Sequence, residues 1–354
     1  LDVILVEQEG ILGGDTLAQP QAADNLAEQI KALKDVGVRI MVRTTAFGLY
    51  DGGVAGLLER VTDHLAEPPT WMPRQRCWTL RARYTVLATG ALERHVAFGN
   101  NDRPGIMTAN AARVYLNRFA VRAGENIVIA TNNDSAYAGA FELAQAGASV
   151  QILDARKSIP DAIRAQAADA HAALRTGAAP LMAHGAKGIT ALDIAEQQAA
   201  NWREAGKTDC DLLLVSGGWS PVVNLLSHRG VKPVWDADLA CFVPGQTNEP
   251  LSMAGSAAGV WNDNACLLSG QAAAERAVTH LGGAQGSTAT PAPGGWQGAI
   301  TPLYEVSVPG RQLKSFVDPQ HDVTTEDVRL AHREGYVSVE HLKRYTTLGM
   351  AADQ

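Results

Sequence analysis

The sequence predicts an α/β protein with two Rossmann-like domains, the inner one inserted into the outer one, and a small C-terminal helical module. Two stretches support this fold class, because residues 1–42 and 126–155 each alternate apolar strands with a helical segment. A third observation is an apolar strand at 211–221 and, further on, a turn that feeds a small-residue helix at 252–278. The outer domain, which the first stretch opens, is therefore expected to be completed after the inner domain ends.

Length and composition indicate a folded protein of two or three domains. The chain has 354 residues, of which 46% are hydrophobic and 19% charged, so it can bury a substantial core. Its net charge of −7 offers no basic face to a nucleic acid, and no apolar run approaches the ~20 residues that span a bilayer. We therefore expect neither nucleic acid nor membrane as a partner and, without a signal peptide, a cytoplasmic location.

Cysteine and histidine spacing predicts no metal site. The histidines show no ligand spacing, no nucleophile has a base beside it, and G-x-S-x-G is absent, so no catalytic residue is assigned. The cysteines form no C-x-x-C pair and are interpreted as buried thiols. They are Cys77, Cys210, Cys241 and Cys266.

The first apolar strand ends in Glu7 and Gln8. In a dinucleotide-binding unit the second strand ends in an acidic residue that accepts hydrogen bonds from a ribose, about 20 residues after a glycine-rich turn. Glu7 suits that role and would favour NAD over NADP, because its carboxylate would repel a 2′-phosphate. Gln8 adds no cation, and the nearest arginines, Arg39 and Arg43, are expected to point away. The first strand and its glycine turn would then precede residue 1, so the sequence is expected to be a fragment with an exposed sheet edge. The alternative is that Glu7 merely ends a surface strand.

Two further turns complete the first part of the outer domain. Gly13 and Gly14 precede a helical stretch at 21–36 and a strand at 38–42. The strand at 81–87 then runs into an Ala-Thr-Gly-Ala turn, where glycine permits close backbone approach to a nucleotide. In two-dinucleotide-domain flavoproteins such a turn brings the backbone near the adenine-ribose end of the nucleotide, and by that likeness Thr89, Gly90 and Ala91 are predicted to line this end of the site.

The inner domain begins with "NIVIATNNDSAY", whose turn lacks the glycines of a phosphate-binding turn. Against G-x-G-x-x-G/A, Thr131, Asn133 and Ala136 occupy the marked positions, and only Ala136 fits. Asp134 adds a negative charge beside any phosphate. The prediction is a Rossmann-like domain that has lost its own nucleotide site. The alternative is that Asn132 and Asn133 bind a ligand through their amides.

After the apolar strand "DLLLVSGGWSP" at 211–221, the chain returns to the outer domain with the turn "SMAGSAAG". In flavin disulfide reductases the matching turn reads A-G-D, and its aspartate binds the ribityl chain and phosphate of the flavin. Here Ser256 follows Gly255, and a serine does not supply the same paired acceptors. A nucleotide without a ribityl chain, NAD or another adenine nucleotide, is therefore favoured over FAD. Gly255, Ser256 and Ala257 complete the predicted cofactor-binding set.

Four segments carry a resemblance to a known family. They are "TGALERHVAFGNNDRPGIM", "ARVYLNRFAVRAGENIVIATNNDSAY", "LLLVSGGWSPVVNLL" and "FVDPQHDVTTEDVRLAHREGYVSVEHLKRYTTLGM", within 89–350. They resemble the α subunit of heterotetrameric sarcosine oxidase and its relatives in proline dehydrogenase and opine oxidase complexes. The resemblance implies an FAD/NAD(P)-binding, pyridine nucleotide-disulfide oxidoreductase-like fold and an inner turn that is glycine-poor throughout the family.

The resemblance also implies cofactors, partners and an activity. It implies a bound NAD that is not known to turn over, FMN at an interface with a β-type flavoprotein subunit that holds FAD, and smaller subunits in a hetero-oligomer. The reaction implied for the complex is the oxidative demethylation of sarcosine, a secondary amine. Two alternatives stay open: a non-catalytic docking scaffold with a decayed reductase fold, and a self-contained NAD(P)H-dependent flavin reductase.

The expected domain limits follow turn signals and composition. The outer domain is expected at 1–115 and 241–281, the inserted domain at 116–240, a Gly- and Pro-rich linker at 282–312, and the helical module at 313–354. In the module, Thr324 or Thr325 is the predicted helix N-cap. Small ferredoxin-like modules in related oxidases carry a C-x-C motif where this chain has Asp-Pro-Gln at 318–320. No iron–sulfur cluster is therefore expected there. A basic run at 341–344 either faces an FMN phosphate or a partner, or is solvated.

Overall fold

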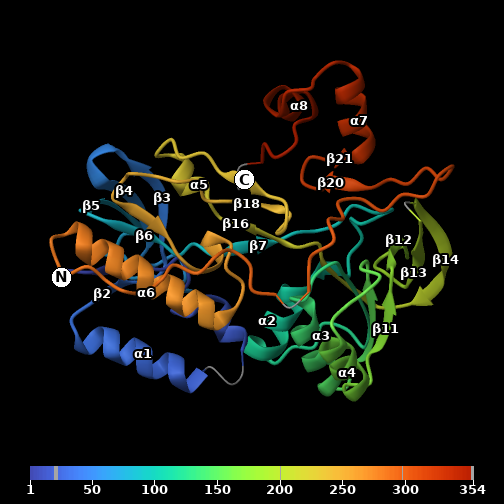
Figure 1. The fold of residues 1–354 in the computed structure, drawn as a ribbon, viewed down its shortest axis with the longest axis horizontal. Coiled ribbons are helices and arrows are strands. Elements are labelled where there is room, and N and C mark those ends of the chain that lie inside the picture. The colour runs from blue at the N-terminus through green and yellow to red at the C-terminus, as the bar shows by residue number, and fades with distance from the viewer. Residues whose placement is uncertain (20–22, 200, 297, 352–354) are drawn as a thin grey trace. The chain divides into compact units, whose positions relative to one another are not determined.

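The computed structural model describes residues 1–19, 23–199, 201–296 and 298–351, and it has the predicted α/β architecture. The chain divides into two units (Figure 1). Unit 1 comprises Leu1–Leu92 and Ser220–Gly295, and unit 2 comprises Glu93–Trp219 and Trp296–Gln354.

The described part of unit 1 is built from short strands in four small sheets. Two sheets are parallel pairs, one is a three-stranded antiparallel sheet, and one is an antiparallel hairpin. The parallel pairs are β1 (Ile4–Val6) with β2 (Arg39–Met41) and β6 (Thr85–Leu87) with β19 (Leu251–Met253); the antiparallel sheets are β3 (Thr44–Tyr50), β4 (Val54–Arg60) and β5 (Gln75–Arg81), and β17 (Val234–Asp236) with β18 (Cys241–Val243).

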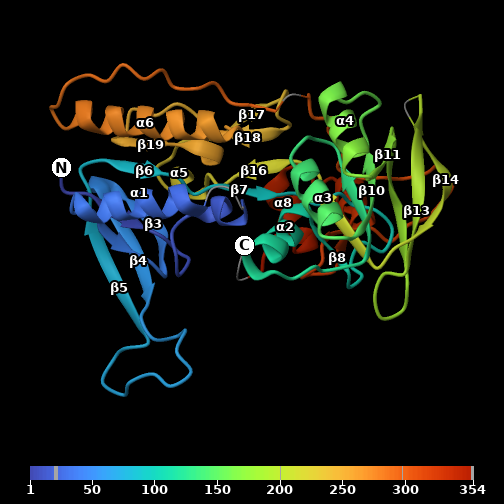
Figure 2. The same cartoon turned by 90° about the horizontal axis from the view of Figure 1, so that it is seen from below.

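Two longer helices accompany these strands. The helix predicted at 21–36 is described as α1 (Ala23–Asp35), and Gln21 lies outside the described residues. The second is α6 (Asp263–His280), which packs along β6 and β19 (Figure 2). Asn262 caps α6, because its side chain accepts a hydrogen bond from the Ala265 N–H at 3.2 Å. The shorter turns of unit 1 are η1 (Gly14–Ala18), η3 (Asp51–Gly53), α5 (Asn224–Ser227) and η4 (Gly255–Ala258).

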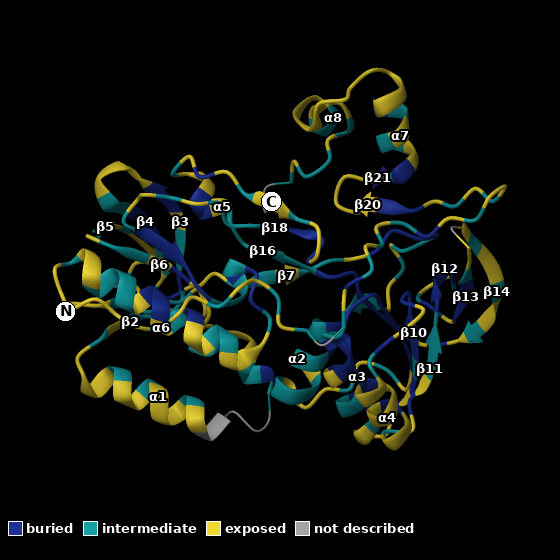
Figure 3. Ribbon diagram, in the orientation of Figure 1, coloured by how far each residue is buried: buried dark blue, intermediate teal, exposed yellow. Residues whose placement is uncertain are grey.

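Unit 2 is organised by a five-stranded parallel sheet in the order β11-β10-β9-β15-β8. Successive side chains of a strand point to opposite faces, so β9 sends Ile127 and Ile129 to one face and Val128 and Ala130 to the other. Figure 3 shows β10 as largely buried. The strands are β8 (Ile106–Thr108), β9 (Asn126–Thr131), β10 (Ser149–Asp154), β11 (Ala173–Thr176) and β15 (Leu212–Ser216).

Each face of this sheet has its own cover. The face of Ile127 and Ile129 packs against helices, in a core that contains Leu143 and Ile163. The face of Val128 packs against a three-stranded antiparallel sheet. The helices are α2 (Ala109–Phe119), α3 (Ala136–Gln145) and α4 (Asp161–Asp169), and the covering strands are β12 (Ala178–His184), β13 (Ala191–Gln198) and β14 (Asn201–Asp209).

The division into units differs from the expected domain limits near residues 116 and 240. The chain changes unit within β7 (Ala91–Glu93) and again within β16 (Trp219–Pro221). Residues 106–108, assigned by sequence to the outer domain, form β8 and pair with β15 in the inner sheet. That pairing joins segments about a hundred residues apart, so turn signals along the chain do not reveal it.

The C-terminal stretch of unit 2 first runs without helix or strand at 298–315, a segment called the strap below, and then forms a small module. The backbone of Ala97 donates to Tyr304 and accepts from Val306, at 2.9 and 2.8 Å, and the Asn101 side chain exchanges two hydrogen bonds with the Phe316 backbone. The expected linker at 282–312 is therefore divided between the two units. The module contains β20 (Phe316–Asp318), β21 (Val323–Thr324), α7 (Thr325–Arg333) and α8 (Val339–Thr346).

Hydrogen bonds of Thr324 and Asp318 organise the C-terminal module. Thr324 is the N-cap of α7, with a capping box in which Asp327 also bonds back to the Thr324 backbone. Asp318, in the Asp-Pro-Gln sequence, accepts hydrogen bonds from the backbone N–H groups of Gly349 and Gln320, which tie the end of α8 to the β20–β21 hairpin. Both contacts lower the pKa of Asp318, since they favour its charged form.

The interpretation of all four cysteines as buried thiols is wrong for Cys77. Cys77 is exposed on β5, an edge strand whose side chains largely face solvent, while Cys210 and Cys241 are buried and Cys266 is half-buried. No helix in the described ranges is both long and apolar enough to cross a membrane.

Candidate functional site

Two of the predicted turns meet at one sheet edge in unit 1. Strands β6 and β19 are parallel, with Leu87 opposite Met253, and the Ala254 N–H donates to the Leu87 carbonyl at 2.9 Å. The Ala-Thr-Gly turn follows β6 directly, and Gly255 follows β19 after one residue. In open α/β sheets, ligands bind outside the carboxyl ends of parallel strands, which is where these two turns lie.

The first turn is held in place and leaves its glycine open. Thr89 donates from its hydroxyl to the Val222 carbonyl at 2.7 Å, and the Gly90 carbonyl accepts from the Val222 N–H at 3.0 Å. Gly90 has a φ of 79°, and a Cβ added there would meet no atom within 4 Å. A ligand can therefore approach the Gly90 backbone, and the left-handed conformation favours glycine. Ala91 begins β7.

The second turn is also held in place, and a Cβ added at Gly255 would lie 3.9 Å from Sγ of Cys266. The Gly255 N–H donates to the Ser269 hydroxyl at 3.1 Å, and Gly255 has a φ of 65°. Ser256 is half-buried, and its carbonyl accepts from the Gly259 N–H at 3.0 Å. Ala257 is fully buried in the core, so only its backbone is available to a ligand. Ser269, on α6, positions this turn and was not predicted, because nothing near it in sequence marks its role.

Glu7 ends β1 and is fixed by its backbone. Its N–H donates to the Met41 carbonyl at 2.9 Å, and its carbonyl accepts from the Thr44 N–H at 2.8 Å. The preceding residue, Val6, packs on the core cluster that contains Leu87 and Met253, so Glu7 shares a core with the two turns. One carboxylate oxygen accepts from the Glu9 N–H at 2.9 Å, and the other has no partner among the described residues. That oxygen can accept a hydrogen bond from a ligand.

The remaining predicted residues have differing surroundings. The Gln8 side chain is exposed, and its carbonyl accepts from the Arg60 guanidinium at 2.5 Å. Gly13 has a φ of 133°, a conformation that favours glycine, and a Cβ there would lie 2.6 Å from the Leu26 side chain. Gly14 has a φ of 53° and open space around it.

Two arginines stand beside the loop that follows Glu7. Arg60 bonds Gln8, and the Arg43 guanidinium lies against Gly10. Both Arg39 and Arg43 were expected to point away from Glu7. The Arg39 guanidinium lies 5.3 Å from the centre of the Trp78 ring. The Arg43 guanidinium, by contrast, lies beside the loop that follows Glu7. Neither periodicity nor motif spacing distinguishes Arg43 from Arg39. Their side chains lie in different surroundings, and the backbone turns at Arg43, where φ is 51°.

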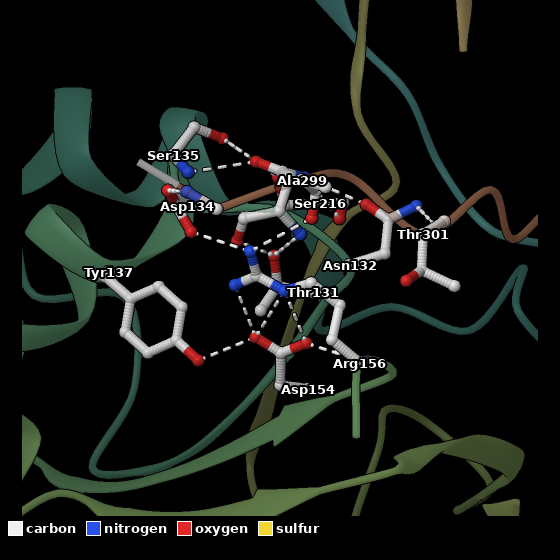
Figure 4. A network of polar contacts seen from close by, with 12 residues as sticks. Thr131, Asn132, Asp134, Ser135, Tyr137, Asp154, Arg156, Ser216, Ala299 and Thr301 are labelled. Carbon is white, nitrogen blue, oxygen red and sulfur yellow. Dashed lines mark hydrogen bonds and ion pairs between the residues drawn. The ribbon is translucent and has the colours of Figure 1, made fainter. Parts of the chain in front are cut away.

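Three backbone N–H groups of the inner turn in unit 2 are bonded within the protein (Figure 4). The N–H of Asn132 donates to the Ser216 carbonyl, that of Asn133 to the Thr131 hydroxyl, and that of Ser135 to the Asn133 side chain. A phosphate-binding turn needs such N–H groups free to face the ligand. The Asn132 amide donates to the Thr301 carbonyl, and the Asn133 amide donates to Asn132 and Ser216. These amides serve the fold, which disfavours the alternative that they bind a ligand.

A buried charge network lies beside the inner turn. Arg156 is 4% exposed and bridges Asp154, at 0%, to Asp134 through ion pairs of 2.7 Å each. Burial alone would lower the pKa of Arg156, but its bonds to the two aspartates raise it. Tyr137 donates to Asp154 at 2.7 Å, and burial together with that carboxylate raises the pKa of Tyr137.

The extended strap covers the same turn. The Gly298 N–H donates to Asp134 at 2.7 Å, and the Thr301 N–H donates to the Asn132 carbonyl at 3.1 Å. In Figure 4 this segment crosses the turn above the Arg156 guanidinium. Asp134, which in a nucleotide site would repel phosphate, is here neutralised by Arg156 and bonded by the strap.

Comparison with solved structures identifies the class of fold. The structure of L-proline dehydrogenase from P. horikoshii matches 99% of this chain and 66% of that chain, with a TM-score of 0.66 and 17% identity. Thioredoxin reductase from T. acidophilum matches 79% of this chain and 89% of that chain, with a TM-score of 0.57 and 13% identity. The fold is therefore that of the Rossmann-like flavoprotein reductases, as predicted.

Within that class the chain is similar in sequence to the alpha subunit of sarcosine oxidase. It is 39% identical over 99% of its length to "Sarcosine oxidase subunit alpha" of Rhizobium meliloti (strain 1021), and 40% identical over 88% to the same subunit of Corynebacterium sp. (strain P-1). Residues 312–354 match the family described as the sarcosine oxidase A3 domain. The chain spans 36% and 33% of the lengths of these two relatives. The predicted resemblance is confirmed.

Proposed function

We propose that this chain is the NAD-binding part of an alpha subunit in a sarcosine-oxidase-type complex. The complex oxidises a secondary amine, by oxidative demethylation of sarcosine, with flavins held in or shared with a partner subunit. One observation carries the nucleotide assignment: two glycine turns, at Gly90 and Gly255, meet at the carboxyl ends of parallel strands, and the space around Gly90 is open. The homology to sarcosine oxidase alpha subunits carries the assignment to this type of complex.

The residues of unit 1 fit the adenine-ribose end of a dinucleotide. The unpaired carboxylate oxygen of Glu7 would accept hydrogen bonds from the ribose hydroxyls. Gly90 and Gly255 would let the backbone approach the nucleotide, because neither carries a side chain and both are held by neighbouring residues. When bound, NAD supplies a hydride-accepting nicotinamide. This chain's own residues bind and orient the adenosine half.

Ser256 supports NAD or another adenine nucleotide over FAD in this unit. A serine hydroxyl accepts and donates single hydrogen bonds, whereas the aspartate of flavin reductases supplies two acceptor oxygens to a ribityl chain. FAD is accordingly assigned to a β-type flavoprotein partner. FMN is assigned to an interface with that partner. The C-terminal module contains the segment, 312–354, that matches the sarcosine oxidase A3 domain. Smaller subunits complete the hetero-oligomer.

The flavin reductase alternative requires a working inner nucleotide site. In unit 2 the turn N–H groups of Asn132, Asn133 and Ser135 are bonded within the protein, and the strap bonds Asp134. This favours the sarcosine oxidase proposal over a self-contained NAD(P)H-dependent reductase. A docking scaffold remains the competing class, because a decayed outer site would keep the same fold.

Calorimetric titration of the full-length protein with NAD tests the proposal. We expect saturable binding of one NAD per chain. Absence of saturable binding would support the scaffold instead. In the same preparation, rapid bleaching of a bound flavin by NADH would support the reductase alternative. Sarcosine-dependent oxygen uptake by the complex, with no uptake by the isolated chain, tests the assignment of the reaction.

A further inference from the structure

Arg43 occupies a constrained position between two parts of unit 1. It lies between β2 and β3 with a φ of 51°, in the left-handed region that a residue with a Cβ adopts at a cost in free energy. Its N–H donates to the Glu9 carbonyl at 2.8 Å, and its carbonyl accepts from the Arg60 N–H at 2.9 Å. These bonds fix the Arg43 backbone against the loop that follows Glu7.

The Arg43 side chain is directed onto that loop. A Cβ built at Gly10 would lie 3.1 Å from Nη2 and 3.3 Å from Cζ of Arg43, so the guanidinium rests on the bare Gly10 backbone. A side chain at position 10 would displace it. The left-handed backbone at Arg43 thus directs its guanidinium toward the loop just after Glu7, the proposed ribose carboxylate.

Arg43 also lacks the partners that its neighbours have. Arg60 bonds the Gln8 carbonyl, and Arg76 pairs with Glu59 at 3.0 Å. The Arg43 guanidinium is half-buried, and in the described part of the chain no carboxylate or carbonyl accepts a hydrogen bond from it. Partly buried donors are normally satisfied, and a guanidinium fork matches the oxygens of a phosphate.

We propose that Arg43 binds a ribose phosphate, so that this site accepts NADP as well as NAD; the inference rests on the proposed nucleotide site. An arginine near the acidic residue at the ribose is the arrangement that accommodates a 2′-phosphate. One oxygen of Glu7 already accepts a hydrogen bond from the Glu9 N–H, whose dipole offsets part of the negative field that a phosphate would meet. Arg60 brings a second positive charge to the same loop. Arg43 thus offsets the repulsion by Glu7 that the sequence alone predicts.

The test compares NADP with NAD on the full-length protein by calorimetric titration. Arg43→Gln should lower NADP affinity by about 10- to 100-fold, because charge-assisted bonds to the phosphate are lost, and should change NAD affinity by less than about 3-fold. Arg43→Lys should fall between wild type and Arg43→Gln, since it keeps the charge but loses the fork. Gly10→Ala should lower NADP affinity selectively, because the added Cβ displaces the guanidinium. Arg39→Gln is the matched control and should leave the ratio unchanged.

The possible outcomes separate this inference from the proposed function. Wild-type protein that binds NAD but not NADP, or an NADP-to-NAD ratio that Arg43→Gln leaves unchanged, overturns the role of Arg43 while the NAD site stands. Binding of neither nucleotide overturns both. Thermal unfolding of each variant identifies any that fails to fold, and Gly10→Ala then decides the question with Arg43 intact.

Discussion

Replacement of Arg156 by methionine should destabilise unit 2 strongly. Methionine keeps an apolar stem of similar length but removes the guanidinium that bridges Asp154 and Asp134. Asp154 would keep the hydrogen bonds from the Tyr137 hydroxyl, at 2.7 Å, and from the residue 156 backbone N–H, at 2.8 Å. It would lose every bond to Nε and Nη2 while remaining fully buried.

The magnitude follows from leaving a buried carboxylate without its cation. Removing one partner of a buried ion pair typically costs about 3–5 kcal/mol. Asp134 also loses its cation but keeps the Gly298 N–H, so the strap should loosen rather than detach. We therefore expect the free energy of unfolding to fall by about 3–5 kcal/mol, since the stranded Asp154 dominates.

The assay is urea unfolding followed by circular dichroism, with two matched variants. Arg164→Met makes the same substitution on an exposed residue of α4 and should change the free energy of unfolding by no more than about 0.5 kcal/mol. Asp154→Asn combined with Arg156→Met should recover at least about 1 kcal/mol, because the buried charge is gone while an acceptor for Tyr137 remains. A loss below about 1 kcal/mol for Arg156→Met, or no recovery in the double variant, would refute this account of the network.

Three further predictions concern the site, a pH dependence and a helix cap. Glu7→Gln should weaken NAD binding by about 1–3 kcal/mol in calorimetry, and an unchanged dissociation constant would reduce Glu7 to a strand-end carboxylate. Burial would raise the pKa of Asp193, but its hydrogen bonds with Arg311 and His184 hold that pKa below the usual 3.8. The charged carboxylate therefore contributes its full stabilisation at neutral pH, and this contribution is lost as the pH falls through the lowered pKa of Asp193. Urea unfolding between about pH 5 and pH 3 should therefore show wild type losing stability relative to Asp193→Asn, and parallel curves would contradict this. Thr324→Ala should destabilise α7 by about 1 kcal/mol, seen as faster amide exchange at 325–333, and unchanged exchange would show that the capping box contributes little.

The inner Rossmann-like core was predictable from sequence because its signals are local. The stretch 126–155 shows strand, turn, helix and strand in order, and the structure has β9, α3 and β10 there. Helix α1 and the Thr324 cap were predictable for the same reason, since periodicity and capping act over a few residues. The resemblance to sarcosine oxidase alpha subunits likewise required only residues in the printed sequence.

The candidate site depended on contacts between residues far apart in the chain. Glycine turns after β6 and β19 were expected separately, but only the pairing of Leu87 with Met253 brings them to one edge. The direction of Arg43 is set by a left-handed backbone held by Glu9 and Arg60, and its residue type alone predicts no such turn.

The sequence by itself determined the fold class, the helical and strand segments of the inner core and the absence of glycine from its turn. Only the tertiary structure decided which residues bond to that turn. Arg156 pairs with Asp134, and the Gly298 N–H donates to Asp134 from 164 residues away. The physical reason is that periodicity and turn chemistry act between near neighbours. A buried charge, in contrast, must find its partner wherever the packed chain brings one within hydrogen-bond reach.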